Sequence, residues 1–259
     1  MSDNLLKQVW EKRSLIILFA INDVKLRYRK SILGFLWSFL EPLLMLSVLY
    51  FVFTNIIKSN IENYPLYLLL GLIIWYMFQR STTMGQSSLL DRAGIIQKIY
   101  FRKEIVVISS CLTAFIMMTF EFAALSVFMI AFHFVPTLTI SLLPFLLIDL
   151  FILCLGISFF LSVLTVYFRD IRFIWQILLQ AGFFITPIIY RLNMFPDSVR
   201  NILQLNPLVP ILDTAHGLVL NNELPTLTET LYILSSTIII LIIGYLIFKT
   251  KSKHLVEEL

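Results

Sequence analysis

The chain has 259 residues, of which 59% are hydrophobic and only 14% are charged, and its formal net charge is +4. Soluble domains carry roughly 25% charged residues, and a mean hydropathy of +0.88 leaves too little polar surface to cover a globule in water. The 23 Phe, against 8 Gly and 9 Pro, exclude disordered and collagen-like chains. The two cysteines lie in apolar runs, so no disulfide framework is expected. The basic residues cluster between apolar blocks, which is not a nucleic-acid signature. The sequence predicts an all-α integral membrane protein.

The apolar run in the N-terminal segment is too short for a membrane span or a cleavable signal. Its apolar run, residues 15–21, has charged flanks, whereas a span needs about 20 apolar residues. Apolar residues recur at helical spacing over residues 4–30, which predicts an amphipathic helix on the cytoplasmic membrane surface. A solvated tail is the alternative. We therefore expect an N-terminal interface helix in residues 1–31 and one transmembrane domain in residues 32–259.

Six stretches can cross a hydrocarbon core of about 30 Å, some with help from their flanks. The fifth is short, and the third is long enough to tilt. Seventeen of the twenty Lys and Arg residues fall before the first stretch, around the loops after the second and fourth, or after the last. The positive-inside rule therefore predicts a multi-pass protein of the cytoplasmic membrane with both termini in the cytoplasm. The six predicted spans are residues 32–57, 64–84, 105–135, 140–168, 173–189 and 227–248.

Residues 190–226 depart from a simple external loop. The segment is long and apolar, and Pro207 and Pro210 interrupt it. Such backbone enters a membrane only where protein or water satisfies its polar groups. We expect two short re-entrant or interfacial helices here, and a structured external cap of no special role is the alternative.

Catalytic constellations are missing from the sequence. None of the eight glycines is followed by Lys, so there is no G-x-x-x-x-G-K-[ST] phosphate loop. His133, His216 and His254 form no metal-ligand spacing, and no G-x-S-x-G elbow occurs. We expect no enzyme, no metal site and no cofactor in this chain, which cannot bind and hydrolyse ATP in the usual way.

Four ionisable residues fall within the predicted spans, where charge is costly and usually faces a bundle interior or a wet cavity. They are Glu41, Arg80, Glu121 and Asp149. Glu121 and Asp149 could pair, become protonated or face a pore. A structural polar contact is the alternative to a direct role in transport.

Residues 27–43 have the sequence Arg-Tyr-Arg-Lys-Ser-Ile-Leu-Gly-Phe-Leu-Trp-Ser-Phe-Leu-Glu-Pro-Leu. This stretch resembles the [KR]-Y-[KR]-x-S-x-L-G-x-x-W-x-x-x-x-P-L opening of ATP-binding-cassette permeases that export O-antigen, capsule and teichoic acid. Tyr-Phe-Arg-Asp-Ile at 167–171, Thr-Pro-Ile-Ile-Tyr at 186–190 and Asn-Pro-Leu at 206–208 are similar to later signatures of that family. The resemblance implies a permease homodimer with two separate ATPase subunits, which hold ATP and Mg, and a lipid-linked glycan as substrate.

Two sets of candidate residues concern the substrate. Arg27, Arg29 and Lys30 lie where the surface helix meets the first span, and such cations can chelate a lipid pyrophosphate. Alternatively, they only set topology or hold anionic lipid. Sugars pack on aromatic rings, although such rings also gather at membrane interfaces. The candidates for the glycan path are Trp37, Tyr67, Trp75, Tyr76, Phe183, Phe184 and Tyr190.

A third set concerns the ATPase subunits. The loops after spans two and four are cytoplasmic by the charge count and can dock a soluble partner, and an anchor on anionic lipid is the alternative for the first loop. The candidate residues are Arg92, Lys98, Arg102, Lys103, Arg169 and Asp170. Together with the resemblance, the sequence predicts the permease subunit of an ATP-driven polysaccharide exporter. A permease for drug or lipid efflux is the alternative, and an ion channel or a polytopic membrane enzyme is the rival of another class.

Overall fold

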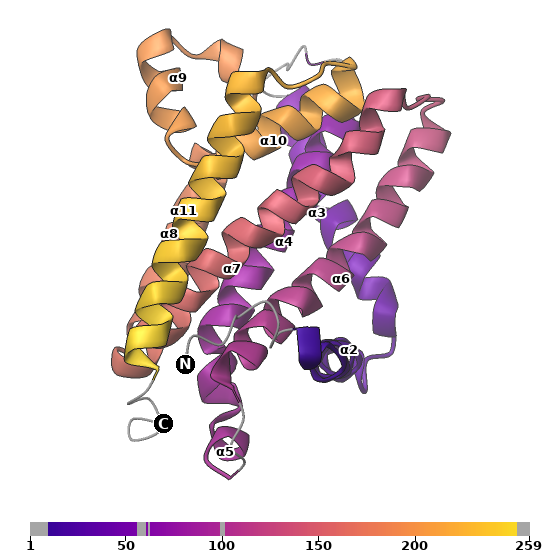
Figure 1. Ribbon diagram of the computed structural model, residues 1–259. Helices are drawn as coiled ribbons and strands as arrows, with labels where there is room; N and C mark the ends of the chain where they lie inside the picture. The colour runs from indigo at the N-terminus through magenta and orange to yellow at the C-terminus, as the bar shows by residue number, and fades with distance from the viewer. Residues whose placement is uncertain (1–9, 56–60, 62, 99–101, 253–259) are drawn as a thin grey trace.

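The computed structural model describes residues 10–55, 61, 63–98 and 102–252, and within these ranges the chain is helical with no strand (Figure 1). This confirms the all-α fold. The first part of the helix expected from residue 4 lies outside the described residues. The elements in chain order are α2 (Arg13–Tyr28), η1 (Gly34–Leu36), α3 (Trp37–Asn55), α4 (Tyr64–Asp91), α5 (Ala93–Ile96), α6 (Lys103–Ala131), η2 (Leu138–Leu142), α7 (Leu143–Tyr167), α8 (Ile171–Ile185), η3 (Leu192–Met194), α9 (Asp197–Gln204), α10 (Leu208–His216), η4 (Gly217–Asn221) and α11 (Leu227–Lys251).

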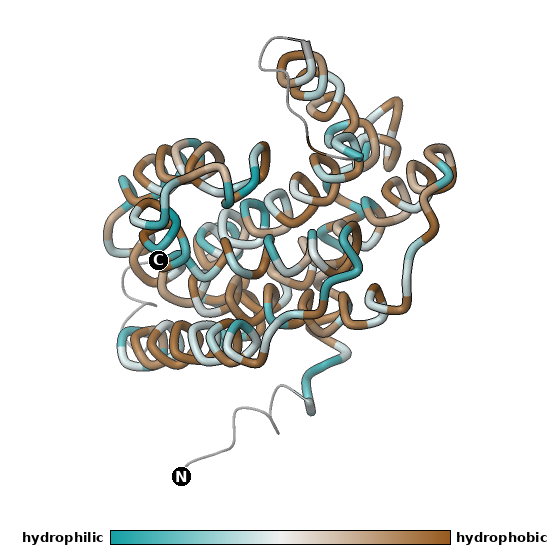
Figure 2. The backbone as a smooth tube through the Cα atoms, turned by 90° about the horizontal axis from the view of Figure 1, so that it is seen from above, coloured by the Kyte–Doolittle hydropathy of each residue, from teal (hydrophilic) through white to brown (hydrophobic). Residues whose placement is uncertain are grey.

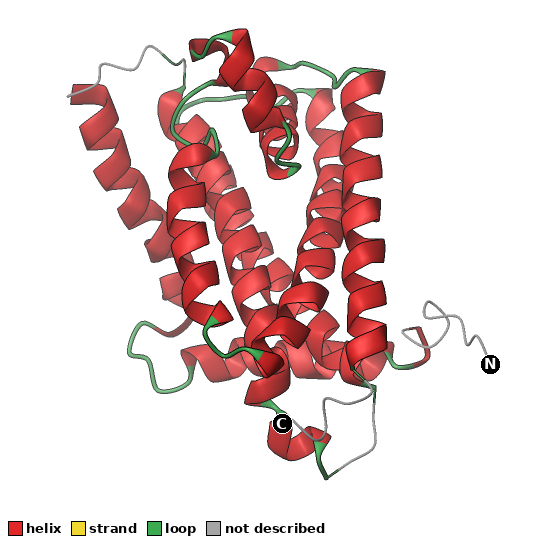
Figure 3. Cartoon of the chain, turned by 90° about the vertical axis from the view of Figure 1, so that its left-hand side faces the viewer, coloured by secondary structure: helices red, strands yellow, loops and turns green. Residues whose placement is uncertain are grey.

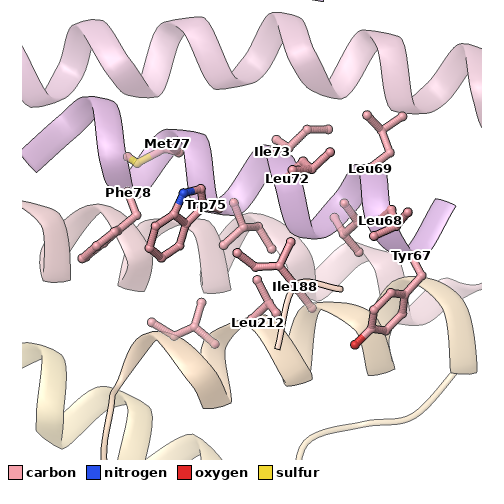
Figure 4. Packing of buried hydrophobic residues seen from close by; sticks show 14 of the residues in the cluster. Tyr67, Leu68, Leu69, Leu72, Ile73, Trp75, Met77, Phe78, Ile188 and Leu212 are labelled. Carbon is pink, nitrogen blue, oxygen red and sulfur yellow. The ribbon is translucent and has the colours of Figure 1, made fainter. Parts of the chain in front are cut away.

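The bundle is built around α4, which packs against α6 and α7, while α7 packs in turn against α11. The first half of α4 is apolar on all sides and almost completely buried, as expected of a helix that neighbours surround. Figure 4 shows this core: Leu72 and Ile73 of α4 lie among neighbouring helices, and Ile188 and Leu212 cover α4 from the segment that follows α8. The core therefore lies on α4, nearer the end at which α10 sits.

Small residues let the long helices approach closely. Gly156 of α7 meets Gly244 of α11 at the crossing of these two helices, and a Cβ at Gly156 would lie 2.7 Å from the Cα of Leu241. Gly85 of α4 meets Ser158 of α7 in the same way. In lipid there is no hydrophobic force between helices, so such close contacts are a main source of helix association.

Four helical stretches are long and apolar enough to cross a membrane: Gly34–Thr54, Lys103–Ala131, Leu138–Tyr167 and Leu227–Lys251. They correspond to the first, third, fourth and sixth predicted spans. The second predicted span, α4, is 28 residues long, but its second half is polar. The fifth, α8, has 15 residues, and at 1.5 Å per residue it is shorter than a hydrocarbon core of about 30 Å. The count of six spans thus stays a prediction.

The two ends of the bundle carry different elements. The helices α2 and α5 and the last turn of α11 lie at one end, which we call the α2 end (Figure 1). The short helices α9 and α10 lie at the opposite end, which we call the α10 end. Two short helices are thus present where the sequence predicted them. Their re-entrant or interfacial placement stays a prediction.

α2 runs across the bundle rather than along it (Figure 3). Its Ile16 and Ala20 are buried, and the helix packs against α6, while Ile17, Leu18 and Leu26 are exposed. The predicted helix is therefore present from Arg13, with its two faces in different environments. Its place on a membrane surface stays a prediction.

α3 leans away from the other helices toward the α10 end (Figure 3). Its Leu44, Val48 and Phe51 are exposed. In the view from above the bundle, much of the helical backbone belongs to hydrophobic residues (Figure 2). The divergence of α3 leaves space beside α2 and α4, and this space holds the candidate site.

Candidate functional site

Three of the four predicted intramembrane charges meet in one cluster, which we call the Arg80 cluster (Glu41, Arg80 and Glu121). Arg80 of α4 pairs through Nη1 with Glu121 of α6, while its Nη2 lies 3.3 Å from Oε2 of Glu41 on α3. Glu121 is completely buried and Arg80 is 7% exposed, whereas the Glu41 side chain is 47% exposed. Burying a charge without a partner is costly, so these three helices are tied together by ionic contacts.

Asp149 lies apart from this cluster. It is half-buried on α7 and lines a separate cavity of about 350 Å³ together with Leu218 and Ile233. The pairing of Glu121 with Asp149 that the sequence left open is not what the structure has, because Glu121 pairs with Arg80. Sequence alone did not reveal this, since Arg80 is distant from both glutamates along the chain.

An open groove of about 640 Å³ adjoins the Arg80 cluster, and we call it the α2–α3 groove. It brings together residues that the sequence assigned to three different roles: the cation Arg27, the aromatic residues Trp37 and Tyr76, and the carboxylate of Glu41. The guanidinium of Arg80 lies over the ring of Tyr76, 5.2 Å from its centroid. The groove therefore has a cation at its α2 side and a second cation behind Glu41. The complete lining is Arg27, Tyr28, Ser31, Trp37, Glu41, Leu44, Met45, Val48 and Tyr76.

A sharp elbow between α2 and α3 gives the groove its shape. Lys30 and Gly34 adopt left-handed backbone conformations, with φ of 69° and 51°. Gly34 can adopt this conformation without cost, and its amide donates to Oγ of Ser31 at 3.2 Å. Phe35 anchors the elbow by packing on Tyr28 and on Phe120 of α6, with ring centroids 5.4 and 4.2 Å apart.

The elbow separates the three cations predicted to bind a lipid pyrophosphate. Arg27, in the last turn of α2, lines the α2–α3 groove. Arg29 and Lys30 are exposed on the elbow itself and do not line that groove. Only one of the three predicted cations is thus in the groove, and the second cation near it, Arg80, comes from another helix.

A second group of aromatic residues lies between α4 and α8. Trp75 and Phe183 pack edge to face with centroids 5.8 Å apart, and both are buried. Nε1 of Trp175 donates to Oγ1 of Thr82 at 3.1 Å. Phe184 faces outward and is exposed. Trp75 and Trp175, but not Phe183 or Phe184, line a cavity of about 260 Å³ that also includes Thr186, Asn206 and Pro207 of the later sequence signatures.

Tyr67 is a buried structural residue at the α10 end. Its hydroxyl donates to the carbonyl oxygen of Tyr190 at 2.9 Å, and Tyr64, one turn away, donates to that of Ile189 at 3.0 Å. His216 stacks on the Tyr67 ring at 3.7 Å, and its Nε2 lies 3.0 Å from the Tyr67 carbonyl oxygen. The irregular backbone after α8 thus finds its hydrogen-bond donors on α4. The hydroxyl of Tyr190 is likewise engaged with the last carbonyls of α8, those of Phe184 and Ile185.

Residues 14–220, most of the chain, match the family described as ABC-2 type transporter. The chain belongs to the ABC-2 type transporter family.

Curated relatives extend this match to nearly the full length. An "O-antigen export system permease protein RfbA" from Myxococcus xanthus is 28% identical, with 98% of this chain and 99% of the relative covered. A protein of the same name from Klebsiella pneumoniae is 32% identical, with 95% and 94% covered. The "Polysialic acid transport protein KpsM" of Escherichia coli is 24% identical, with 92% and 93% covered. The chain is thus an ABC-2 transporter membrane subunit.

The residues predicted to contact ATPase subunits lie at the α2 end of this ABC-2 chain. Two of them are engaged in contacts within the chain, and four are exposed. Arg92 is engaged: its Nη2 pairs with Asp23 of α2, and its Nη1 donates to Oγ of Ser110 at 3.2 Å. Lys103 donates from Nζ to the carbonyl oxygen of Ser252, after α11. The other four are exposed, namely Lys98, Arg102, Arg169 and Asp170.

The sequence reasoning missed two residues that organise this ABC-2 subunit. Asp23 links α2 to Arg92, and Thr113 of α6 lies 3.5 Å from the same carboxylate. A single acidic residue within a basic segment was the available signal. Tyr64 had no signal, because its role depends on backbone carbonyls more than 120 residues later. Among the described residues, no group of three or more His, Cys, Asp or Glu side chains is placed to hold a metal.

Proposed function

We propose that this chain is the membrane-spanning permease subunit of an ATP-driven exporter that moves polyprenyl-linked polysaccharide across the cytoplasmic membrane. The observation that carries the proposal is the nearly full-length similarity to permeases named for O-antigen export and polysialic acid transport. The lack of a phosphate loop in the sequence fits an energy source in a separate subunit that binds ATP and Mg.

The proposed topology has six spans with both termini in the cytoplasm. The helices α3, α4, α6, α7, α8 and α11 are the six candidates. The short helix α8 would be completed by residues 186–190, whose carbonyls are supplied with donors by Tyr64 and Tyr67, as membrane depth requires. The excess of Lys and Arg near the α2 end supports a cytoplasmic location for that end.

A homodimer is supported by the outer face of α8. Gln176 and Gln180 lie one turn apart on this helix and are exposed, with no hydrogen-bond partner among the described residues. A glutamine that faces lipid leaves an amide without partners, which is costly. A second copy of the permease, or a water-filled path between two copies, would satisfy both side chains.

The α2–α3 groove is the proposed site at which the lipid-linked substrate is taken up. Arg27 supplies a cation for a phosphate group, and Trp37 and Tyr76 offer aromatic surfaces beside it. The apolar side chains of Leu44 and Val48 line the groove along α3 and offer a surface on which a polyprenyl chain would pack. The groove thus combines phosphate, sugar and lipid chemistry in one place.

Two cytoplasmic elements are proposed to contact the ATPase subunits: the α5 region with Lys98 and Arg102, and the turn with Arg169 and Asp170. All four side chains are exposed at the α2 end. Replacing Arg169 and Asp170 with Ala should leave membrane insertion intact while uncoupling ATP hydrolysis from export. Unchanged export and substrate-stimulated hydrolysis in that double variant would exclude this turn from coupling.

The direct test of the function is transport by the assembled complex. The permease is purified with a co-expressed ATP-binding subunit and reconstituted in phospholipid vesicles that contain a fluorescent polyprenyl diphosphoryl glycan. We expect ATP-dependent movement of the glycan, which is lost when the phosphate-loop Lys of the ATPase is replaced. Movement of lipophilic drugs without movement of the glycan would instead favour the efflux alternative.

A further inference from the structure

Glu41 stands between the α2–α3 groove and Arg80. Its side chain lines the groove and is 47% exposed, while its carboxylate lies 3.3 Å from Nη2 of Arg80. Arg80 is 7% exposed and does not line the groove. The glutamate thus occupies the face of the guanidinium that an anion in the groove would otherwise reach.

The two carboxylates on Arg80 differ in how easily they can leave. Glu121 is completely buried and would be stranded without its partner, so it is a fixed counter-ion. Glu41 is half-exposed, and ion pairs of that kind contribute little, because water can take over from the partner. Arg80 therefore has one permanent anion and one exchangeable anion.

Resting on the proposed function, we propose that Glu41 is a specificity filter for the linkage of the lipid carrier. In the empty groove Glu41 covers Arg80. A diphosphate displaces it, with one phosphate held by Arg27 and the other by Arg80, whereas a single phosphodiester does not. Arg80 is thus a second phosphate-binding residue, available only to a ligand with two phosphates.

The selectivity follows from counting charges. Each phosphate of a phosphodiester or diphosphodiester carries one negative charge, so a single phosphodiester offers Arg80 no more than the tethered carboxylate already does. A diphosphate satisfies both Arg27 and Arg80, which repays the release of Glu41 into water. An ordinary anionic phospholipid places its one phosphodiester at Arg27, where the undisplaced carboxylate of Glu41 lines the same groove and weakens binding by like-charge repulsion. An unfavourable contact that only the wrong ligand makes is a common source of specificity.

The experiment measures binding to the full chain in phosphatidylcholine nanodiscs. The two probes are a polyprenyl diphosphoryl hexose and a polyprenyl phosphoryl hexose, which differ by one phosphate. The wild type should prefer the diphosphate. Glu41→Gln should reduce that preference by about tenfold, because the single-phosphate ligand at Arg27 escapes the repulsion of the carboxylate, whereas the diphosphate, which already displaces Glu41, gains little. Glu41→Asp, which keeps the negative charge in the groove, should retain most of the preference. Asp149→Asn is the matched control, because Asp149 lines a different cavity, and it should leave the preference unchanged.

Four results would contradict the filter. A preference in Glu41→Gln equal to that of the wild type, or an equal loss of preference in Glu41→Asp and Glu41→Gln, would overturn the filter while leaving the proposed export function standing. Equal loosening in Asp149→Asn would also overturn it, because the effect would then be general to intramembrane carboxylates. Failure of the wild type to bind either probe would contradict the proposed uptake of a polyprenyl-linked substrate, and the filter with it.

Discussion

Two tyrosines of α4, Tyr67 and Tyr76, lie in different surroundings. Near the α10 end, Tyr67 is buried, and its hydroxyl donates hydrogen bonds to the backbone carbonyls of residues 187 and 190. Two and a half turns later, Tyr76 lines an open groove and lies beneath the guanidinium of Arg80. The first tyrosine fixes structure, and the second is available to a ligand. Aromatic content alone therefore does not separate tyrosines that fix structure from tyrosines open to a ligand, whereas burial and hydrogen-bond partners do.

The largest effect is expected where a buried charge loses its partner. Arg80→Leu leaves Glu121 buried and unpaired, so we expect a loss of about 3 kcal/mol or more in unfolding free energy, seen as a lower thermal midpoint of the full chain in detergent. The double variant with Glu121→Leu should regain much of that stability. An unchanged midpoint in Arg80→Leu would show that the Arg80 cluster does not hold α4 and α6 together.

A smaller loss is expected at the crossing of α7 and α11. A Cβ on Gly244 would collide with the backbone of Gly156, so Gly244→Ala should separate the helices and lower the unfolding free energy by about 2 kcal/mol. Gly94→Ala is the matched control, because nothing lies within 4 Å of a Cβ there. Equal thermal midpoints for the two variants would contradict the close crossing.

The smallest stability effect is expected at Tyr67. Tyr67→Phe removes the donor for the carbonyls of Pro187 and Tyr190, which should cost about 1 kcal/mol and speed amide hydrogen exchange in residues 186–191. Tyr76→Phe is the comparison, because the Tyr76 hydroxyl has no hydrogen-bond partner among the described residues. If the two variants gave the same exchange rates in residues 186–191, the distinction between the two tyrosines would fail.

Sequence periodicity predicted the elements better than it predicted their partners. The long apolar stretches and the short helices after α8 were foreseeable, because hydropathy and proline positions are local properties. The meeting of Glu41, Arg80 and Glu121 was not, because it depends on how three helices rotate against each other. For the same reason Trp37 and Tyr76 could be named as aromatic candidates, yet nothing local separated them from the buried Trp75.

The elbow between α2 and α3 shows the same limit on a smaller scale. The motif residues Arg27 and Arg29 are two positions apart and share charge and type, so sequence treats them as equivalent. The helix ends between them, since Arg29 is already extended and Lys30 is left-handed. Only Arg27 therefore reaches the α2–α3 groove, and this difference allows a paired test.

The most direct test of the α2–α3 groove as the substrate site compares Arg27→Gln with Arg29→Gln in the assembled transporter. Each variant removes one cation, so both should insert normally and assemble with the ATPase subunits. We predict that Arg27→Gln weakens the stimulation of ATP hydrolysis by polyprenyl diphosphoryl glycan, raising the half-maximal concentration by about tenfold, while Arg29→Gln changes it by less than about twofold. Equal effects of the two variants, or wild-type stimulation in Arg27→Gln, would contradict the account.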